Sequence, residues 1–444
     1  MTSVPVVQYA SRTDVGMRRA ANQDNLAVRM CTDFEEWSRC GHLFAVADGM
    51  GGHAVGDLAS RITVSTLPLA DYKQEAADVS SRLRQAITAA NKAINDKSRE
   101  NREFEGMGTT CSVLSLSEAG AMIGHVGDSR VYRVRKGRIE QLTFDHSLQW
   151  EMIRLGRATA ENVELYHPRN VITRCLGPDL SVQIDVEGPF SVEPDDVFML
   201  CSDGLTNHVN DDEIGLILSG LPPEKSSRLL IDLANCRGGS DNSTVIVVHI
   251  ESYPALTVRL PDSSPLPAPA AASPAGGFPV ALMLLMALIS LGLAGWTVSK
   301  GRPELSAIFA IAAFAAFLLS RYFRPEPSPA SRLPPAPLAP LPDDPHADPS
   351  MSSALRSSFR TSPPYRMVDC QNPLALLKYL AEAQSELAQA ARDSSWRVDF
   401  DELTQLGRQA TAAMQSEKPD RAIRARARAI ELLMKEIYQR RSTS

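Results

Sequence analysis

Four apolar segments along the chain each have an aspartate at one end. Three of them run into the acid: FAVAD ends at Asp48, MIGHVGD at Asp128 and FMLCSD at Asp203. In the fourth, Asp241 precedes the β-branched run STVIVV. Such short apolar runs predict buried strands, although an Asp-Gly pair after a strand can also mark an ordinary turn. Carboxylates that converge from several strands are typical of a site for hard divalent cations, and the repetition favours such a site.

Amphipathic stretches between these runs predict helices. The first extends from about residue 56 to 67, after the glycines that follow Asp48, and the second contains SSRLRQAITAANKAINDKSRE. A sharp turn beside Asp48 is expected, because glycine has no Cβ and lets another group approach the backbone. The alternation of strand and helix patterns extends over residues 5–252, which we predict to form one domain.

The composition changes after residue 252. Proline-rich segments at 253–277 and 324–370 predict extended linkers. Between them lie two apolar runs, 278–298 and 305–323, and a helix of about 20 such residues crosses roughly 30 Å of hydrocarbon. We predict a transmembrane hairpin that leaves both flanking parts on one side of the membrane. A buried helical hairpin in a soluble domain is the alternative.

Charge and cysteine content bear on location and partners. The net charge of the 444 residues is −6, which argues against nucleic acid as a partner. The seven cysteines include no CxxC pair, which indicates a reducing compartment and no zinc site. We expect anchoring in the inner or cytoplasmic membrane, with the first domain and the tail facing the cytoplasm. The basic residues that weakly favour this orientation are Arg259, Arg321, Arg324 and Arg332, against Lys300 and Arg302 in the short loop.

The tail at 371–441 is predicted to be a separate helical module. Its apolar residues recur at the spacing of one helical face. They are Leu374, Leu377, Leu380, Ala383 and Leu387, and then Ile423, Ala427, Ile430, Leu433 and Ile437. The arginines of the second series either contact anionic lipid or an acidic partner, or form a solvated helix face.

Aspartates at several strand ends suit a hydrolase that uses two metal ions. Two divalent ions bridged by a carboxylate can activate a water and stabilise the charge on a phosphoryl group during in-line attack. Asp48 suits the bridging position, while Asp203 and Asp241 suit the others. Arg18 and Arg19 lie upstream, and either could pair with two phosphate oxygens through its planar guanidinium.

An ordered set of motifs resembles the bacterial type 2C, or PPM, metal-dependent serine/threonine protein phosphatases. The motifs are GMRRAANQDN, FAVADGMGGHAVGDLAS, MGTTCSVL, GHVGDSRVYRVRKG, LTFDHS, NVITRCLG, MLCSDGLTNHV and SDNSTVIVV. The resemblance covers roughly residues 8–250. It implies an α+β fold, a four-layer α-β-β-α sandwich whose two packed antiparallel sheets hold Mn²⁺ or Mg²⁺ at one end. It does not extend to the apolar hairpin or the tail.

The resemblance also implies roles for the acids, carried over by position. Asp48 would bridge two ions, and the backbone carbonyl of Gly49 would ligate one of them. Asp203 and Asp241 would hold the other ion. Asp128, together with Asp203, would bind a third, more weakly held ion.

Further roles follow from the same resemblance. Arg19 stands five residues before Asp24 and matches the phosphate-binding arginine of the family. Asp24 would act on the metals through water, and Gln23 beside it replaces a glutamate common in the family, which removes one charge. Met50 stands where eukaryotic members have a histidine that serves as general acid. His53 is the nearest substitute, although it could equally hold the glycine loop, and metal-bound water could supply the proton instead.

Three functions are compatible with these features. The first is a membrane-tethered phosphatase that acts on phosphorylated proteins, such as a serine/threonine kinase or its substrates, and opposes a kinase. The second is a catalytically weak phosphatase-fold module that serves as a membrane-anchored binding or scaffold protein. The third is a membrane assembly factor whose working part is the tail. The presence of all four strand-end acids favours catalysis.

Overall fold

The structure is a computed structural model of the 444-residue chain. It describes residues 4–51, 55–73, 78–159, 163, 168, 171–254, 362–370 and 372–443. The predicted transmembrane runs, 278–298 and 305–323, lie outside these residues. Among the described helices, none combines the length and the apolar character needed to cross a membrane.

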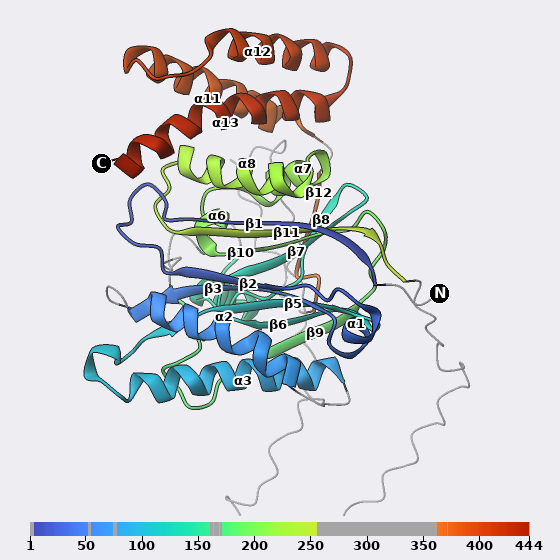
Figure 1. The fold of residues 1–444 in the computed structure, drawn as a ribbon, viewed down its shortest axis with the longest axis vertical. Helices are drawn as coiled ribbons and strands as arrows, with labels where there is room; N and C mark the ends of the chain where they lie inside the picture. The colour runs from blue at the N-terminus through green and yellow to red at the C-terminus, as the bar shows by residue number, and fades with distance from the viewer. Residues whose placement is uncertain are drawn as a thin grey trace, which may run out of the picture. The chain divides into compact units, whose positions relative to one another are not determined.

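Two antiparallel sheets form the centre of the fold (Figure 1). The first has the order β1-β11-β10-β7-β8-β12, made of Val6–Asp14, Ser243–Ser252, Val197–Cys201, Arg130–Arg135, Arg138–Gln141 and Arg366–Asp369. The second has the order β2-β3-β5-β6-β9, made of Asp24–Arg29, His42–Met50, Cys111–Ser117, Gly120–Val126 and Asp185–Phe190. The short β4, Gly108–Thr109, pairs with the end of β3.

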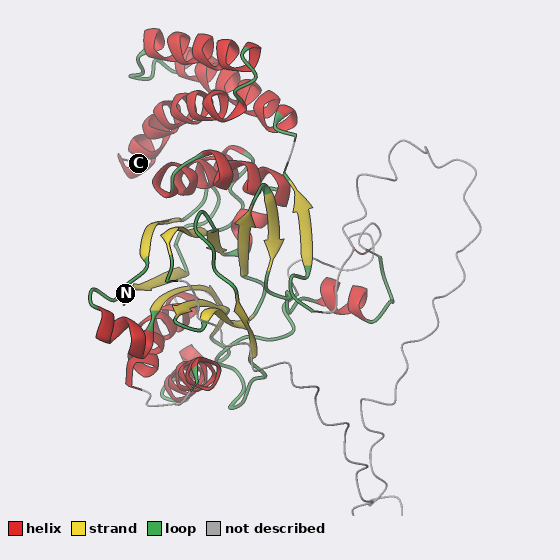
Figure 2. Ribbon diagram, turned by 90° about the vertical axis from the view of Figure 1, so that its right-hand side faces the viewer, coloured by secondary structure: helices red, strands yellow, loops and turns green. Residues whose placement is uncertain are grey.

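Helices cover the outer face of each sheet, as Figure 2 shows from the side. The pair α2 (Val55–Lys73) and α3 (Val79–Ser98) packs on the second sheet, and the pair α7 (Asp211–Gly220) and α8 (Pro223–Cys236) packs on the first. Shorter helical turns are α1 (Phe34–Cys40), η1 (Arg102–Phe104), α4 (Leu148–Arg154) and α6 (Asp203–Thr206). The two predicted helices of the first domain therefore correspond to α2 and α3. Helix α2 extends past the expected residues at both ends, whereas α3 ends at Ser98, two residues before the end of the predicted stretch.

Strand β3 shows how the sequence pattern produces these layers. Successive side chains of a strand point to opposite faces. Leu43 and Ala45 lie in the cluster beneath α2 and α3, whereas Phe44 and Val46 lie in the cluster between the two sheets. Because apolar residues occupy both faces, the strand reads as a continuous apolar run. The resulting order of helix, sheet, sheet, helix confirms the predicted four-layer sandwich.

The segment after the second linker completes the first sheet. Strand β12, Arg366–Asp369, pairs with β8 in the register Met367 to Glu140 and Val368 to Ile139. The prediction that 324–370 is linker throughout is therefore wrong at its C-terminal end. A strand of four residues carries little pattern of its own, and its pairing with the exposed edge of β8 decides its structure.

The tail forms three helices that pack on the first domain. They are α11 (Leu374–Asp393), α12 (Phe400–Gln415) and α13 (Pro419–Thr443). Residues of α11 and α13 such as Leu380, Ile423 and Ile430 are buried in the same apolar cluster as Ile217 of α7 and Leu233 of α8. The helical character of the tail was predicted, but its separateness was not correct, because α7 and α8 present an apolar outer face that the tail covers.

Candidate metal centre

Strand pairing brings the first two acids of the site together. Asp24 at the start of β2 lies directly opposite Asp48 near the end of β3. The backbone of Asp48 is fixed by two threonines: its N–H donates to Thr110 Oγ1 at 2.9 Å, and its carbonyl accepts from Thr109 Oγ1 at 2.8 Å. Hydrogen bonds to its own backbone therefore fix the position of Asp48 near the end of β3, a strand inside the sheet.

The next two acids come from the first sheet, across the sandwich. Asp203 follows β10 and begins α6, and Asp241 precedes β11. Gly204 lies so close to the carbonyl oxygen of Asn242 that a Cβ on Gly204 would overlap it. This backbone contact holds the two acid-bearing segments against each other, and only glycine permits it.

Asn242 joins these segments to the turn before β2. Its Nδ2 donates to the carbonyls of Val15 and Ala21 at 2.9 and 3.0 Å, and its Oδ1 accepts from the N–H of Gln23 at 2.8 Å. The sequence analysis did not single out Asn242, although it lies inside the SDNSTVIVV motif. Its role is visible only from the contacts, because its partners lie more than 200 positions away in the chain.

The acids form one electrostatic cluster. Burial, followed by the charges of Asp24, Asp203, Asp128 and Asp241, raises the pKa of Asp48 well above its usual range. Burial and neighbouring acids likewise raise the pKa of Asp24 to about 7, while burial and Asp203 raise the pKa of Asp128. Like charges brought together away from water disfavour ionisation unless a cation neutralises them.

The donor set fits divalent cations. Asp48, Asp203 and Asp241 are partly exposed, whereas Asp24 and Asp128 are buried behind them. One carboxylate oxygen of Asp24 and one of Asp128 are buried with no hydrogen-bond partner among the described residues. Clustered carboxylate oxygens of this kind suit Mg²⁺ or Mn²⁺, which prefer oxygen ligands.

Arg19 forms an ion pair with one acid of this cluster, Asp241. Its Nη2 donates to Asp241 Oδ2 at 2.7 Å, and its Nε donates to the carbonyl of Ser240 at 3.3 Å. The side chain is 51% exposed. The guanidinium therefore stands at the rim of the acid cluster, with one face open to an approaching anion.

The other predicted site residues lie in or beside the same place. Asp24 accepts a hydrogen bond of 2.7 Å from Ser202 Oγ. The backbone carbonyl of Gln23 accepts from the N–H of Gly49 at 3.1 Å, and a Cβ on Gly49 would overlap the backbone at the start of α2. His53 lies outside the described residues, so its role stays a prediction.

His146, in the LTFDHS motif, contacts the backbone next to Asp128. The N–H of Gly127, next to Asp128, donates to His146 Nδ1 at 3.0 Å. The other ring nitrogen, Nε2, is therefore the protonated one, and it donates to Asp185 Oδ2 at 2.9 Å. The motif was recognised in the sequence, but its structural role depends on strands that only the fold brings together.

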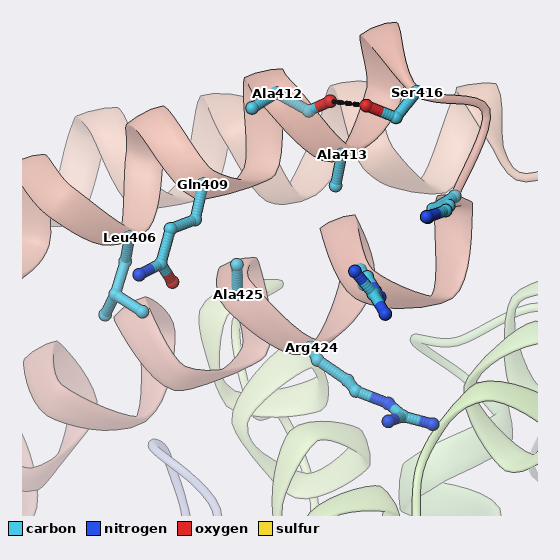
Figure 3. A pocket seen from close by; sticks show the side chains of 9 residues that line it. Leu406, Gln409, Ala412, Ala413, Ser416, Arg424 and Ala425 are labelled. Carbon is cyan, nitrogen blue, oxygen red and sulfur yellow. Dashed lines mark hydrogen bonds between the residues drawn. The ribbon is translucent and has the colours of Figure 1, made fainter.

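A pocket of about 490 Å³ lies elsewhere, between α12 and α13 (Figure 3). Its polar lining includes Lys418, Arg421 and Arg424, and no acid. Three positive side chains cannot hold a metal cation, so this pocket is not the metal centre.

Comparisons with known proteins identify the family of the chain. A family model described as protein phosphatase 2C matches residues 17–236. A putative protein phosphatase 2C-type from Streptococcus pyogenes serotype M6 is 38% identical over 250 residues, which are 55% of this chain and 98% of that protein. The serine/threonine protein phosphatase PstP of Mycobacterium tuberculosis is 33% identical over 249 residues, 56% of this chain and 46% of that protein.

A solved structure gives the same result. That of the serine/threonine phosphatase Stp1 from Staphylococcus aureus is 30% identical, with a TM-score of 0.50, and the match covers 57% of this chain and 98% of Stp1. The range matched by the family model contains Asp24, Asp48, Asp128 and Asp203, and ends five residues before Asp241. The chain belongs to the protein phosphatase 2C family and is a protein serine/threonine phosphatase.

Proposed function

We propose that this chain is a metal-dependent enzyme that hydrolyses phosphoserine and phosphothreonine in proteins by direct attack of water, with two ions of Mn²⁺ or Mg²⁺. The observation that carries the proposal is the cluster of five aspartates, in which burial, together with the charges of neighbouring acids, raises the pKa of Asp48 and Asp24. When bound, the ions would activate the attacking water and neutralise charge on the phosphoryl group.

The residues divide the binding of the ions among them. Asp48 would contact both ions from the end of β3, with the carbonyl of Gly49 beside it. Asp203 and Asp241, which come from the other sheet, would hold the second ion. Asp128, held by the Gly127 contact to His146, would take part with Asp203 in a weaker third position.

The substrate phosphate would bind to Arg19. Its guanidinium can present two parallel N–H donors to two phosphate oxygens, which a lysine could not do. Asp24 and Gln23 would order the water around the ions. His53 would donate the proton to the leaving hydroxyl of the substrate, with water as the alternative donor.

Membrane tethering is part of the proposal. The apolar runs at 278–298 and 305–323 would anchor the chain in the cytoplasmic membrane with the phosphatase domain and tail on the cytoplasmic side. Tethering raises the local concentration of membrane-bound substrates. We therefore expect phosphoproteins at the membrane, including a serine/threonine kinase or its targets, to be dephosphorylated.

A scaffold function remains the second candidate, because a phosphatase fold can be kept for binding alone. The observation against it is that every acid of the cluster is present and brought to the same end of the sandwich. The scaffold would not require a site whose carboxylates repel one another, since such repulsion costs stability without a cation.

The test uses the full-length chain, since the tail is part of the folded core. Hydrolysis of a phosphothreonine peptide is measured with Mn²⁺, with Mg²⁺ and with EDTA. Asp48→Asn should lower kcat/KM by at least about 100-fold, which corresponds to roughly 2.7 kcal/mol of transition-state stabilisation. The control is Asp195→Asn, the same change at a side chain that is 93% exposed. Hydrolysis that persists in EDTA or in Asp48→Asn would refute the metal-dependent mechanism, and a folded chain without activity would favour the scaffold.

A further inference from the structure

The last helix of the tail contacts the turn that leads to Arg19. In α13, Arg441 donates to both carboxylate oxygens of Asp14, from Nη1 to Oδ1 at 3.2 Å and from Nη2 to Oδ2 at 2.9 Å. Arg441 Nη1 also donates to the carbonyl of Gly16 at 2.8 Å. Figure 1 shows the turn after β1 lying beside the C-terminal end of α13. A guanidinium that makes both contacts neutralises the charge of Asp14 and fixes the orientation of the turn.

The turn at residues 14–16 packs against the segment that carries Asp241. Asp14 Oδ1 accepts from the N–H of Gly16 at 2.9 Å, and Gly16 has a φ of +80°. A Cβ on Gly16 would overlap the carbonyl oxygen of Asp241. Three residues later in the chain, Arg19 returns to donate to the Asp241 carboxylate. The contacts therefore run without a gap from Arg441 through Asp14 and Gly16 to Asp241 and its partner Arg19.

A second side chain of α13 reaches the same carboxylate indirectly. Tyr438 Oη donates to Asp232 Oδ1 at 2.6 Å and accepts from Asn235 Nδ2 at 3.1 Å. Asn235 Nδ2 also donates to Asp14 Oδ1, at 3.1 Å. Helix α8, which carries Asp232 and Asn235, thus lies between Tyr438 and the turn. Asp14 Oδ1 accepts three hydrogen bonds, from the Gly16 N–H, Asn235 Nδ2 and Arg441 Nη1. Arg441 belongs to α13, and Asn235 is itself hydrogen-bonded to Tyr438 of α13.

We propose that α13 is a positioning element of the phosphatase site, in which Arg441 and Tyr438 hold the Asp14 turn so that Arg19 is oriented for the substrate phosphate. The inference rests on the proposed function of Arg19. Arg441 and Tyr438 contact neither the acids of the metal cluster nor the substrate, so they are positioning residues. The tail lies outside the region matched by the phosphatase 2C family model, and this chain supplies the support from its own extension.

The expected effect is on phosphate binding. Without Arg441 the turn would have to be ordered each time a phosphate binds, and that cost would weaken the binding. Because the phosphate is held in both the ground state and the transition state, the loss should appear mainly in KM. We expect Arg441→Ala to raise KM for a phosphothreonine peptide about three- to tenfold and to change kcat less than twofold.

Three further variants of the full-length chain sharpen the test. Arg441→Lys keeps a charge near Asp14 but cannot form the paired contact, so its KM should lie between those of the wild type and Arg441→Ala. Tyr438→Phe removes one hydroxyl only and should shift KM in the same direction by a smaller factor. Lys435→Ala removes a charge from an exposed position of the same helix and should leave KM unchanged. Equal thermal midpoints would show that all variants are folded.

Two readouts do not require turnover. The dissociation constant of inorganic phosphate, measured by calorimetry with Mn²⁺ present, should rise in Arg441→Ala by the same factor as KM. Amide hydrogen exchange over residues 14–19 should become faster in Arg441→Ala and remain unchanged in Lys435→Ala. If the wild-type chain hydrolysed no peptide, the proposed function would fail, while these two readouts would still decide the role of α13. Unchanged phosphate affinity and unchanged exchange in Arg441→Ala would overturn the inference.

Discussion

Gly204 and Asp203 illustrate how single residues set the geometry of the site. The proposed sharing of one ion requires Asp203 to lie close to Asp241. The two segments that carry them meet where Gly204 touches the carbonyl oxygen of Asn242. The contact is between backbones, so no rotation of a side chain can relieve an added methyl group. A glycine without a proposed chemical role thereby controls the separation of two proposed metal ligands.

Substitution of Gly204 tests this control. Gly204→Ala should destabilise the chain by about 1–3 kcal/mol, the usual cost of overpacking a well-packed site. It should also lower kcat/KM, because Asp203 and Asp241 are pushed apart. Stability is measured by urea unfolding, and activity on the phosphothreonine peptide.

The matched control is Gly407→Ala in α12, where the nearest atom to an added Cβ is Gln384 Nε2 at 3.8 Å. Alanine should stabilise that helix by up to about 1 kcal/mol, because glycine is a poor helix former. A Gly204→Ala chain as stable and active as the wild type would show that the backbone contact does not hold the two acids in place.

At the scale of elements, the packing of α13 on α8 contains a buried acid. Burial raises the pKa of Asp232 to about 7, although Tyr438 donates a hydrogen bond to it. In the unfolded chain an aspartate titrates near 4. Between these values the folded chain holds a proton that the unfolded chain has lost. The stability contributed by this group therefore falls as the pH rises from about 4 to about 7 and stays low above that range.

The pH dependence can be measured with Asp232→Asn. An asparagine can still accept from Tyr438 through its Oδ1 and does not ionise. At pH 8 the variant should be more stable than the wild type by on the order of 1–4 kcal/mol, and at pH 4 the difference should be small. The free energy of unfolding is measured by chemical denaturation at each pH. A difference that is independent of pH would contradict the raised pKa.

Over the whole molecule, the tail and the phosphatase domain share one core. Residues of α11 and α13 complete the apolar cluster on α7 and α8, and β12 pairs with β8 at the edge of the first sheet. Gly215 of α7 is in contact with the sulfur of Cys370, where a Cβ would overlap it. The phosphatase sandwich of this chain therefore carries a further helical layer.

Removal of the tail tests the shared core. A chain ending at residue 254 would expose the apolar faces of α7 and α8 and the edge of β8. We expect a lower thermal midpoint than in the full chain, together with self-association, because exposed apolar patches and open strand edges favour it. Thermal unfolding and light scattering measure both effects. A monomeric truncated chain with an unchanged thermal midpoint would mean that the tail is a separate module, as the sequence had suggested.

The local pattern of the sequence was enough to predict the four apolar strands that carry aspartates at their ends and the two helices of the first domain, because burial leaves a direct trace in residue order. Recognition of the family motifs then supplied the four layers. The roles of His53 and the membrane spans at 278–298 and 305–323 stay predictions, since these residues are not described.

Tertiary structure alone decided the contacts between distant segments. The pairing of Asp24 with Asp48, the links made by Asn242 and the contact of Arg441 with Asp14 each join residues whose separation along the chain carries no signal. Strand β12 was likewise decided by the tertiary structure, because its four residues form a strand only by pairing with β8. Local sequence determines which elements form and which face of each is apolar. Which faces and which polar groups meet depends on how the layers pack in three dimensions.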